Sequence, residues 1–338
     1  MQRVAVVGLG FMGKTHAIAY SAIESAELAK VVDVQEEVAR EVAQEHGAEP
    51  ATFDDVLADD SISIVDICLP TDMHREYTIR ALEAGKHVLC EKPMARTVED
   101  ARAMAEAAAA SDKFLMIAHV LRFWPEYELF KRRYDAGEFG AIRQLACRRL
   151  SPRPKWSWDS WITDESRSGS ALLDLHIHDI DWVAYICGRP KAVTARAVRN
   201  ETGWCHVYCT YEFENDVVAF AEGGWDMPPS FPFNMAFCAI CEKGVYVYDS
   251  GKDPAVSIFR EGAEEPEHPE IEPVVAAGAA AGGNISELGG YYLECKYFVE
   301  CVESGTPPTV VTPEQALQDI EIAFAELQSV NERTTVSL

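Results

Sequence analysis

The sequence has few positive charges and no long apolar run. Lysine and arginine number 30 against 55 aspartate and glutamate residues, which gives a net charge of -25. A surface this acidic repels phosphate backbones and anionic lipid headgroups, so we expect no nucleic-acid partner and no membrane partner. No apolar run reaches the roughly 18 residues of a spanning helix, and the first residues show no signal-peptide pattern. We therefore expect a cytoplasmic protein.

The length of 338 residues exceeds what one ordinary core holds, so two domains are expected.

Ten cysteines without a secretory signal indicate reduced thiols. The pairs Cys205/Cys209 and Cys238/Cys241 have spacings that loosely resemble zinc ligands, but neither has a clear second half. We expect buried strand cysteines there and no metal site.

The first third of the chain alternates short apolar runs with amphipathic segments. This rhythm predicts parallel βαβ units, and the nearly continuous hydrophobicity of the strands predicts a sheet covered on both faces. We expect an α/β fold in which residues 1–122 form a doubly wound Rossmann domain. The expected strands are residues 3–7, 29–34, 62–69, 87–90 and 114–120, and the expected helices are 12–21, 36–46, 73–84 and 98–111.

The rhythm changes beyond residue 122, where β-rich segments follow one another with few helices between them. Residues 123–338 are expected to form an α+β domain with a large, open, mostly antiparallel sheet. The expected strands are residues 143–150, 191–197, 205–213, 217–225, 233–239, 245–249 and 256–260, and the expected helices are 125–136, 169–187, 285–304 and 313–331. The acidic stretch 262–273 and the Ala/Gly tract 276–283 are expected to be surface loop.

A glycine motif lies between the first strand and the first helix. Gly8, Gly10 and Gly13, with Phe11 and Met12 inside the motif, predict a turn that cradles a dinucleotide pyrophosphate on the helix N-terminus. Asp33 follows about twenty positions later, where a carboxylate binds the adenosine ribose hydroxyls and repels a 2′-phosphate. The sequence therefore favours NAD over NADP, with a simple turn residue as the alternative for Asp33.

A second candidate group follows the third strand, at a sheet edge where cofactors bind in doubly wound folds. Pro70 and Thr71 lie directly after the strand, and His74 starts the next helix. We expect these residues to contact the cofactor. The alternative is that Thr71 is an N-cap and His74 an ordinary first-turn residue, which for His74 is equally supported.

Glu91, Lys92 and Pro93 follow the fourth strand, at the edge expected to face the nicotinamide. A lysine that is partly desolvated near a positive ring has its ammonium form disfavoured, which makes proton exchange near neutral pH possible. The alternative is a surface lysine. A cis Lys92–Pro93 bond, which would change the direction of the lysine, is a further hypothesis.

The segment 169–187 carries a helical apolar stripe, and Asp174 and His178 are four residues apart on one face. A carboxylate beside an imidazole orients it and raises its pKa, as a general base requires. The alternative is a solvated helix face with incidental charges. His176 is a second candidate for the base, but His178 has the better spacing from Asp174.

The combination of these motifs resembles the Gfo/Idh/MocA family, which includes glucose–fructose oxidoreductase and inositol dehydrogenase. The resemblance covers essentially the whole chain, including the pattern Tyr297-Phe298-x-x-Cys301 and Gly305-x-Pro307-Pro308. It implies a bound nicotinamide cofactor, an open antiparallel sheet and a homodimer or homotetramer formed through that sheet. The chain departs from the family pattern in two places: Ser168-Gly169-Ser170 stands where the family has a glycine-rich segment, and His176 stands where it has a glycine.

The same resemblance assigns roles to individual positions. Lys92, Asp174 and His178 match the catalytic residues, Glu91 matches a residue near the nicotinamide ribose, and Arg122 matches a residue bordering cofactor and substrate. The implied activity is oxidation of a secondary hydroxyl of a sugar, a sugar derivative or a cyclitol, with Lys92, Asp174 and His178 contacting the substrate. Either His178 or Lys92 accepts the proton.

The tryptophan cluster Trp156, Trp158 and Trp161 offers a stacking surface for a sugar, and Trp161 is our candidate substrate contact. A packed loop or an oligomer contact is equally supported.

Two other functions compete with a dehydrogenase. One is an NAD-retaining glycosidase that oxidises a ring carbon transiently, and the other is a non-catalytic sensor, which the intact catalytic set disfavours.

Overall fold

The computed structural model describes residues 1–155, 157–271, 274 and 288–338. Trp156 and the Ala/Gly tract 276–283 lie outside the described residues, as do positions 272 and 273 of the acidic stretch. The chain forms two compact units. The first unit comprises residues 1–124, 156–161 and 273–317, and the second comprises residues 125–155, 162–272 and 318–338.

Each unit is built from three separate stretches of the chain, so no single boundary after residue 122 divides them. The helix α10 (Gly289–Ser304) belongs to the first unit although it follows the second domain in sequence. It does so because it packs against α1 (Phe11–Ala22) and contacts β1 (Gln2–Val7). The helix also fits closely against residues 120–124, since a Cβ on Gly290 would lie 2.8 Å from the Trp124 ring.

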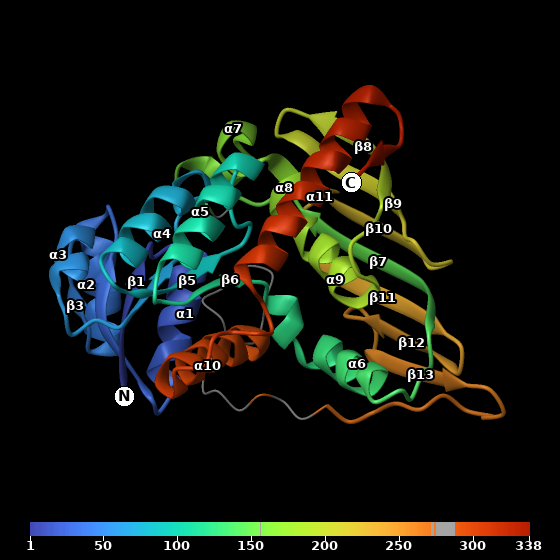
Figure 1. The fold of residues 1–338 in the computed structure, drawn as a ribbon, viewed down its shortest axis with the longest axis horizontal. Coiled ribbons are helices and arrows are strands. Elements are labelled where there is room, and N and C mark those ends of the chain that lie inside the picture. Colours follow the sequence, from blue (N-terminus) through green and yellow to red (C-terminus); the bar gives the residue numbers. More distant parts are fainter. Residues whose placement is uncertain (156, 272–273, 275–287) are drawn as a thin grey trace. The chain divides into compact units, whose positions relative to one another are not determined.

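The first unit contains a six-stranded sheet in which every pair is parallel (Figure 1). Its strand order is β3-β2-β1-β4-β5-β6, which is the Rossmann order and confirms the predicted doubly wound sheet. The order reverses between β1 and β4, and ligands bind such sheets at the carboxyl ends of the strands flanking that point. The remaining strands are β2 (Ala26–Val32), β3 (Glu49–Pro50), β4 (Ile64–Ile67), β5 (His87–Glu91) and β6 (Leu115–Ala118).

Helices cover this sheet, which explains its apolar strands. All four residues of β4 and of β6 are buried, as covered parallel strands require. Contacts pair α1 with α2 (Glu36–His46) and α4 (His74–Glu83) with α5 (Val98–Ala110). The short elements β3 and α3 (Phe53–Ala58) of the first unit were not predicted from the sequence. A capping box between Thr52 and Asp55 begins α3, and this sequence pattern could have predicted the start of the helix.

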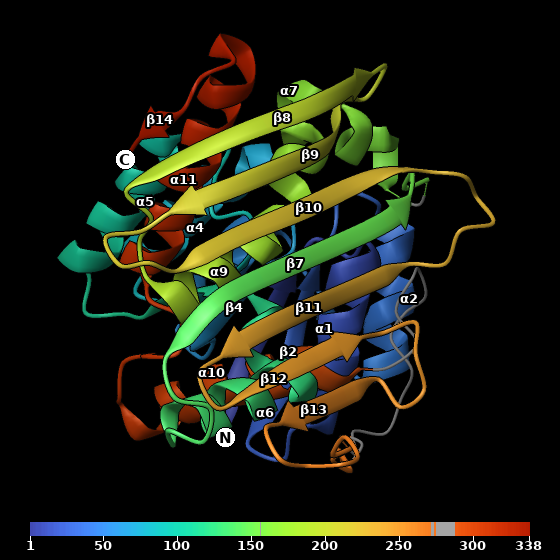
Figure 2. The same cartoon turned by 90° about the vertical axis from the view of Figure 1, so that its right-hand side faces the viewer.

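The second unit contains an eight-stranded sheet with the order β13-β12-β11-β7-β10-β9-β8-β14 (Figure 2). Every pair is antiparallel except β7 with β10, which confirms the predicted open, mostly antiparallel sheet. The strands are β7 (Ile142–Pro152), β8 (Ala192–Asn200), β9 (Gly203–Glu212), β10 (Val218–Met227), β11 (Asn234–Cys241), β12 (Gly244–Asp249), β13 (Val256–Arg260) and β14 (Val336–Ser337).

Aromatic residues form the core on one face of this sheet. Tyr127, from α6 (Pro125–Asp135), has its ring 4.8 Å from that of Trp182 and 4.7 Å from that of Phe237. Trp182 belongs to α9 (Ile177–Cys187) and Phe237 to β11, so these contacts fix both helices on the sheet. The opposite face carries exposed Tyr208, Val218 and Phe220.

The predicted single helix over residues 169–187 is wrong in detail. The chain forms α8 (Ser170–Asp174) and then α9, with a turn at Leu175 and His176 between them. The His176 N–H donates to the carbonyl oxygen of Ala171, five residues earlier, at 2.9 Å. This wide turn resembles a π-bulge, which interrupts the regular helical ladder and often marks functional sites. A short helix, α7 (Glu165–Ser168), precedes it.

The last long helix is α11 (Pro313–Glu332). Among the described residues, no helix combines the length and the apolar character needed to cross a membrane.

Candidate active site

The glycine motif forms a tight loop against the end of β4. Gly8 has φ of +91°, and a Cβ there would lie 2.6 Å from the carbonyl oxygen of Cys68. A Cβ on Gly13 would lie 1.7 Å from the carbonyl oxygen of Gly8. A Cβ on Gly10 would meet nothing within 4 Å, so its surroundings are open. The loop therefore needs Gly8 and Gly13 for packing and leaves space at Gly10, where Phe11 and Met12 begin α1.

Asp33 lies directly after β2 and holds this loop in place. Its Oδ2 accepts the Leu9 N–H at 2.8 Å, and its Oδ1 accepts the Gln35 N–H at 2.8 Å. The side chain is only partly buried. Each carboxylate oxygen has a second lone pair, so the group can still accept hydrogen bonds from ribose hydroxyls.

Thr71 begins a short 3-10 helix, η1 (Thr71–Met73), after β4. It is 2% exposed, and its hydroxyl oxygen has no hydrogen-bond partner among the described residues. Buried hydroxyls are almost always hydrogen-bonded in native proteins. An orphaned hydroxyl at the cofactor edge of the sheet, together with the open space at Gly10 and the Asp33 carboxylate, fits a bound dinucleotide.

His74 is buried, and both of its ring nitrogens face backbone carbonyl oxygens. Nδ1 lies 2.9 Å from the carbonyl oxygen of Pro93, and Nε2 lies 2.8 Å from that of Leu69. Burial lowers the pKa of the imidazole, although these two hydrogen bonds oppose the change. With both nitrogens engaged, His74 links the β4 end to the Pro93 segment, which favours a positioning role over direct cofactor contact.

Glu91 and Lys92 come at the end of β5. The Lys92–Pro93 peptide bond is cis, as hypothesised, and Lys92 is partly exposed. The Lys92 N–H donates to Glu91 Oε2 at 3.1 Å, and Glu91 Oε1 lies 3.3 Å from His16 Nε2. The Glu91 carboxylate is thus directed at a buried histidine of the same unit.

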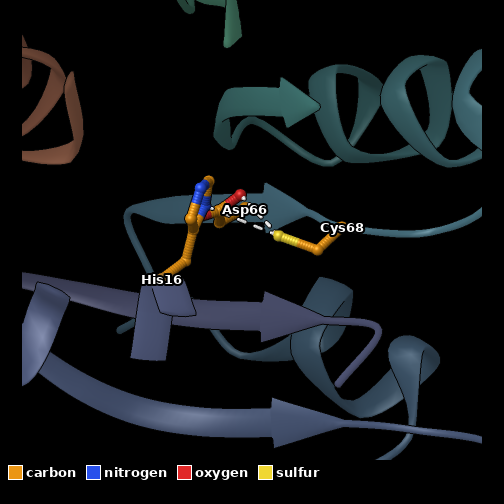
Figure 3. A group of neighbouring side chains, drawn as sticks. All are labelled: His16, Asp66 and Cys68. Carbon is orange, nitrogen blue, oxygen red and sulfur yellow. Dashed lines mark hydrogen bonds and ion pairs between the residues drawn. The ribbon is translucent and has the colours of Figure 1, made fainter. Parts of the chain in front are cut away.

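His16 forms a polar cluster with Asp66 and Cys68, whose side chains point toward one another (Figure 3). His16 Nδ1 lies 2.8 Å from Asp66 Oδ2, and both side chains are fully buried. The sequence analysis did not identify this cluster. A readable signal was Asp66 itself, a carboxylate inside an apolar strand covered on both faces, where a charge needs a partner.

Arg122 belongs to the 3-10 helix η2 (Val120–Phe123) and is 5% exposed. Its Nη1 donates to the carbonyl oxygen of Val310 at 2.5 Å and to Gln315 Oε1 at 2.6 Å. These bonds tie the segment after β6 to Val310, which precedes α11, and to the first turn of α11 at Gln315. Arg122 therefore has a structural task in the first unit besides the cofactor contact that the resemblance implies.

Asp174 and His178 belong to the second unit, on either side of the turn between α8 and α9. Asp174 is 6% exposed and His178 is partly exposed. The neighbouring buried pair Arg149 and Asp179 fixes this turn to the sheet, because Arg149 Nε donates to Asp179 Oδ2 at 3.0 Å. The sequence analysis did not predict this ion pair.

His176, the second candidate base, is fully buried. Its Nε2 lies 3.2 Å from Glu326 Oε2, and Glu326 Oε1 accepts the Tyr211 hydroxyl at 2.8 Å. A Cβ at Gly223 would lie 2.8 Å from His176 Nδ1, so a glycine on β10 makes room for the imidazole. The ring is enclosed by the core of the second unit, and this favours His178 as the base.

Trp158 and Trp161 lie in the 3-10 segment η3 (Trp158–Thr163). Trp158 is 48% exposed and Trp161 is partly buried. Asp159 and Ser160 between them have φ of 49° and 51°, a left-handed conformation that is uncommon for residues other than glycine. The segment therefore presents aromatic surface on a tightly turned backbone.

All ten cysteines are free thiols, which agrees with the prediction of reduced cysteines. Cys205, Cys209 and Cys241 are buried and Cys238 is partly buried, as expected for strand positions. Burial raises the pKa of Cys241 to about 11.

Two family models match the chain. Residues 2–119 match the oxidoreductase family with an NAD-binding Rossmann fold, and residues 127–247 match the Gfo/Idh/MocA C-terminal domain. Among curated proteins, a levoglucosan dehydrogenase of Pseudarthrobacter phenanthrenivorans is 36% identical over 57% of this chain and 53% of its own length. An inositol 2-dehydrogenase of Rhizobium meliloti is 33% identical over 58% of each protein. These two alignments thus span little more than half of the relatives' length.

A third relative aligns over a longer stretch. The 4-carboxy-2-hydroxymuconate-6-semialdehyde dehydrogenase of a Sphingobium strain is 31% identical over 76% of this chain and 84% of its own length. A solved levoglucosan dehydrogenase, in complex with NADH and levoglucosan, has a TM-score of 0.87 at 25% identity and covers 99% of each chain. The family models, this relative and the shared fold lead to one conclusion: the chain belongs to the Gfo/Idh/MocA family of oxidoreductases, with an N-terminal NAD-binding Rossmann fold.

Proposed function

We propose that the protein is an NAD-dependent dehydrogenase that oxidises a secondary hydroxyl of a sugar, a sugar derivative or a cyclitol. The observation that carries this proposal is the match to both family models. Relatives named as levoglucosan, inositol and D-glucoside dehydrogenases support the substrate class. The semialdehyde dehydrogenase among the relatives is the reason to test the substrate class directly.

The cofactor preference rests on Asp33. Its carboxylate holds the glycine loop through the Leu9 N–H, and its negative charge would bind ribose hydroxyls and repel the 2′-phosphate of NADP. The open side of Gly10 and the orphaned hydroxyl of Thr71 supply the remaining contacts. When bound, NAD supplies the hydride acceptor.

Lys92, Asp174 and His178 are proposed as the catalytic residues. The Lys92 ammonium hydrogen-bonds the substrate oxygen, where negative charge grows as the hydroxyl loses its proton. His178 accepts that proton while Lys92 stays an ammonium; in the alternative, Lys92 begins as the neutral amine, accepts the proton itself and then donates to the oxygen. Asp174 orients the His178 ring. Trp161 is the proposed stacking surface for the sugar ring, while Glu91 and Arg122 are assigned to the cofactor side.

The test uses the purified protein with NAD, measured by absorbance at the NADH band. Its substrate panel contains cyclitols, hexoses, glycosides and the semialdehyde. We expect NADH formation with at least one polyol. Turnover of the semialdehyde alone would contradict the substrate class, and glycoside cleavage without net NADH would favour the NAD-retaining glycosidase.

Lys92→Ala and His178→Ala test the catalytic assignment. Each variant should lower kcat by roughly 100-fold or more, because one transition-state hydrogen bond or one proton acceptor is lost. Both should still bind NADH, measured by its fluorescence. Lys113→Ala and His46→Ala are matched controls, since Lys113 pairs with exposed Asp112 and His46 contacts Ser21 at the end of α2. A normal kcat in either active variant removes that residue from the proposed mechanism.

The open face of the second unit's sheet is the proposed self-association surface. It carries Tyr208, Val218 and Phe220 with exposed fractions of 51%, 58% and 40%. Large apolar side chains exposed together on one sheet face favour a protein contact there. Sedimentation should return a dimer or tetramer, and a monomer mass would contradict the proposal.

The free thiols and acidic surface support our further proposal of a cytoplasmic location.

A further inference from the structure

A buried polar cluster lies at the carboxyl end of β5, where Glu91 is the last residue of the strand and Lys92 follows it. Its members come from separate elements of the first unit: His16 from α1, Asp66 from β4 and Glu91 from β5. His16 and Asp66 are 0% exposed and Glu91 is 6% exposed. Burying three ionisable groups is unfavourable unless they compensate one another. The proposed mechanism assigns no task to His16 or Asp66.

The geometry of the cluster favours a charged imidazole. Both ring nitrogens of His16 lie near carboxylates: Nδ1 is hydrogen-bonded to Asp66 Oδ2 at 2.8 Å, and Nε2 is at an ion-pair distance of 3.3 Å from Glu91 Oε1 without hydrogen-bond geometry. A neutral imidazole has one N–H donor, whereas an imidazolium has two. Protonated His16 also compensates part of the negative charge of two buried carboxylates. The arrangement is therefore carboxylate, imidazolium, carboxylate.

A metal ion is the alternative occupant of this cluster. The ligand atoms of His16, Asp66 and Cys68 lie within 4.8 Å of one another (Figure 3). However, Cys68 Sγ donates to Asp66 Oδ1 at 3.4 Å, and His16 Nδ1 lies directly against the other Asp66 oxygen. These contacts pair the groups with one another, and burial raises the pKa of the Cys68 thiol, which disfavours the thiolate that a metal requires.

The cluster continues into the backbone of the proposed catalytic lysine. The second oxygen of Glu91 accepts the Lys92 N–H at 3.1 Å. On the other side of Lys92, the carbonyl oxygen of Pro93 faces His74 Nδ1 at 2.9 Å. The segment 91–93 is thus held on both sides of Lys92: the Glu91 carboxylate accepts the Lys92 N–H, and the His74 ring binds the carbonyl oxygen of Pro93.

We propose that Asp66, His16 and Glu91 form a buried relay that fixes the segment carrying Lys92, so that His16 and Asp66 are positioning residues for hydroxyl oxidation. The inference rests on the proposed function for its kinetic consequence. Its structural part, a protonated His16 between two carboxylates, holds independently of any substrate.

The electrostatics agree with this geometry. Burial lowers the pKa of His16, but Cys295, Asp66 and Cys68 outweigh it, so the pKa lies well above its ordinary value. Burial raises the pKa of Glu91, but the hydrogen bond and charge of His16 leave it below its ordinary value. Other titratable groups near the cluster are Tyr20 on α1 and Cys295 and Tyr291 on α10.

The first experiment measures the protonation of His16 without substrate. Histidine labelled with ¹³C and ¹⁵N is followed by NMR between pH 6 and 9, and Asp66→Asn identifies the His16 signal among the nine histidines. We expect an imidazolium at neutral pH in the wild-type protein and a lower midpoint in Asp66→Asn. A neutral His16 at neutral pH, or stoichiometric metal in the purified protein, would overturn the relay.

The second experiment is kinetic, with the best polyol from the substrate panel. Asp66→Asn and His16→Gln should lower kcat by roughly 10- to 100-fold, because small displacements of a catalytic group have effects of that size. The KM for NAD should change less than kcat, and the rate should acquire a new pH dependence in Asp66→Asn. His87→Gln is the control, since His87 lies at the opposite end of β5 and accepts the Phe114 N–H at 3.0 Å.

The outcomes separate the two proposals. An unchanged kcat and pH profile in a folded Asp66→Asn variant would refute the relay while leaving the dehydrogenase intact. Absence of turnover in the wild-type protein, with a protonated His16, would refute the proposed function while leaving the relay intact. If His16→Gln fails to fold, the wild-type NMR titration and Asp66→Asn still decide the question.

Discussion

Replacing Asp33 by asparagine should relax the preference for NAD over NADP. Asparagine keeps the shape and one acceptor oxygen, so it can still hold either the Leu9 or the Gln35 N–H, both of which the carboxylate now binds at 2.8 Å. What it removes is the negative charge. The substitution therefore separates the electrostatic role of Asp33 from most of its structural role, which alanine would not do.

The size of the effect follows from Coulomb's law. A unit charge on a 2′-phosphate about 5 Å from the carboxylate is repelled by about 3.3 kcal/mol at an effective dielectric constant near 20, and by about 0.8 kcal/mol in bulk water. Asp33 is partly buried, so its surroundings fall between these limits. The ratio of kcat/KM for NAD to that for NADP should therefore fall by about 10- to 100-fold.

The assay is initial-rate kinetics with both cofactors at low, fixed ionic strength, because salt screens a partly exposed charge. Asp112→Asn is the matched control, since it removes the same charge from an exposed position before β6, at the other edge of the sheet. An unchanged cofactor ratio in Asp33→Asn, or an equal change in the control, would refute the assignment of Asp33 to the adenosine ribose.

Two further predictions concern the first unit. Gly13→Ala should abolish NADH binding measured by fluorescence and lower Tm, because a Cβ would lie 1.7 Å from the Gly8 carbonyl oxygen; retained binding would contradict the loop geometry. The raised pKa of His16 predicts that its stabilising contribution is complete below about pH 6.5 and is lost as pH rises through the folded-state value. The Tm of wild-type protein should therefore fall toward that of His16→Gln between pH 6.5 and 9, by about 2–4 °C per pH unit, and a constant difference would contradict a protonated His16.

Periodicity was sufficient for the first unit's sheet because its strands are buried on both faces. The runs around Val6 and Leu89 are nearly continuously apolar, and the run around Val65 is interrupted only by Asp66; short runs of this kind, alternating with helical patterns, are typical of a covered parallel sheet. Two-residue strands such as β3 carry too few positions for any periodicity. The return of α10 to the first unit is also invisible locally, since it depends on contacts with α1, far away in sequence.

The candidate site also has features that local sequence predicts and features that depend on contacts between distant residues. The tight loop at Gly8 and Gly13 could be predicted because local backbone geometry dictates glycine at both positions, whereas the role of Asp33 toward the ribose stays a prediction. The relay could not be predicted, since residues 16, 66 and 91 meet only after the sheet has formed. The turn at His176 depends on Glu326 and on the space left by Gly223, so sequence spacing alone predicted an uninterrupted helix there.

We propose that Lys92 and His178 act on the same substrate hydroxyl. A double-mutant cycle tests it most directly, with kcat measured for wild type, Lys92→Ala, His178→Ala and the double variant. Groups that act as a unit give strongly non-additive losses, so the double variant should be no more than about threefold slower than the slower single variant. Losses that multiply independently across the two substitutions would contradict the account.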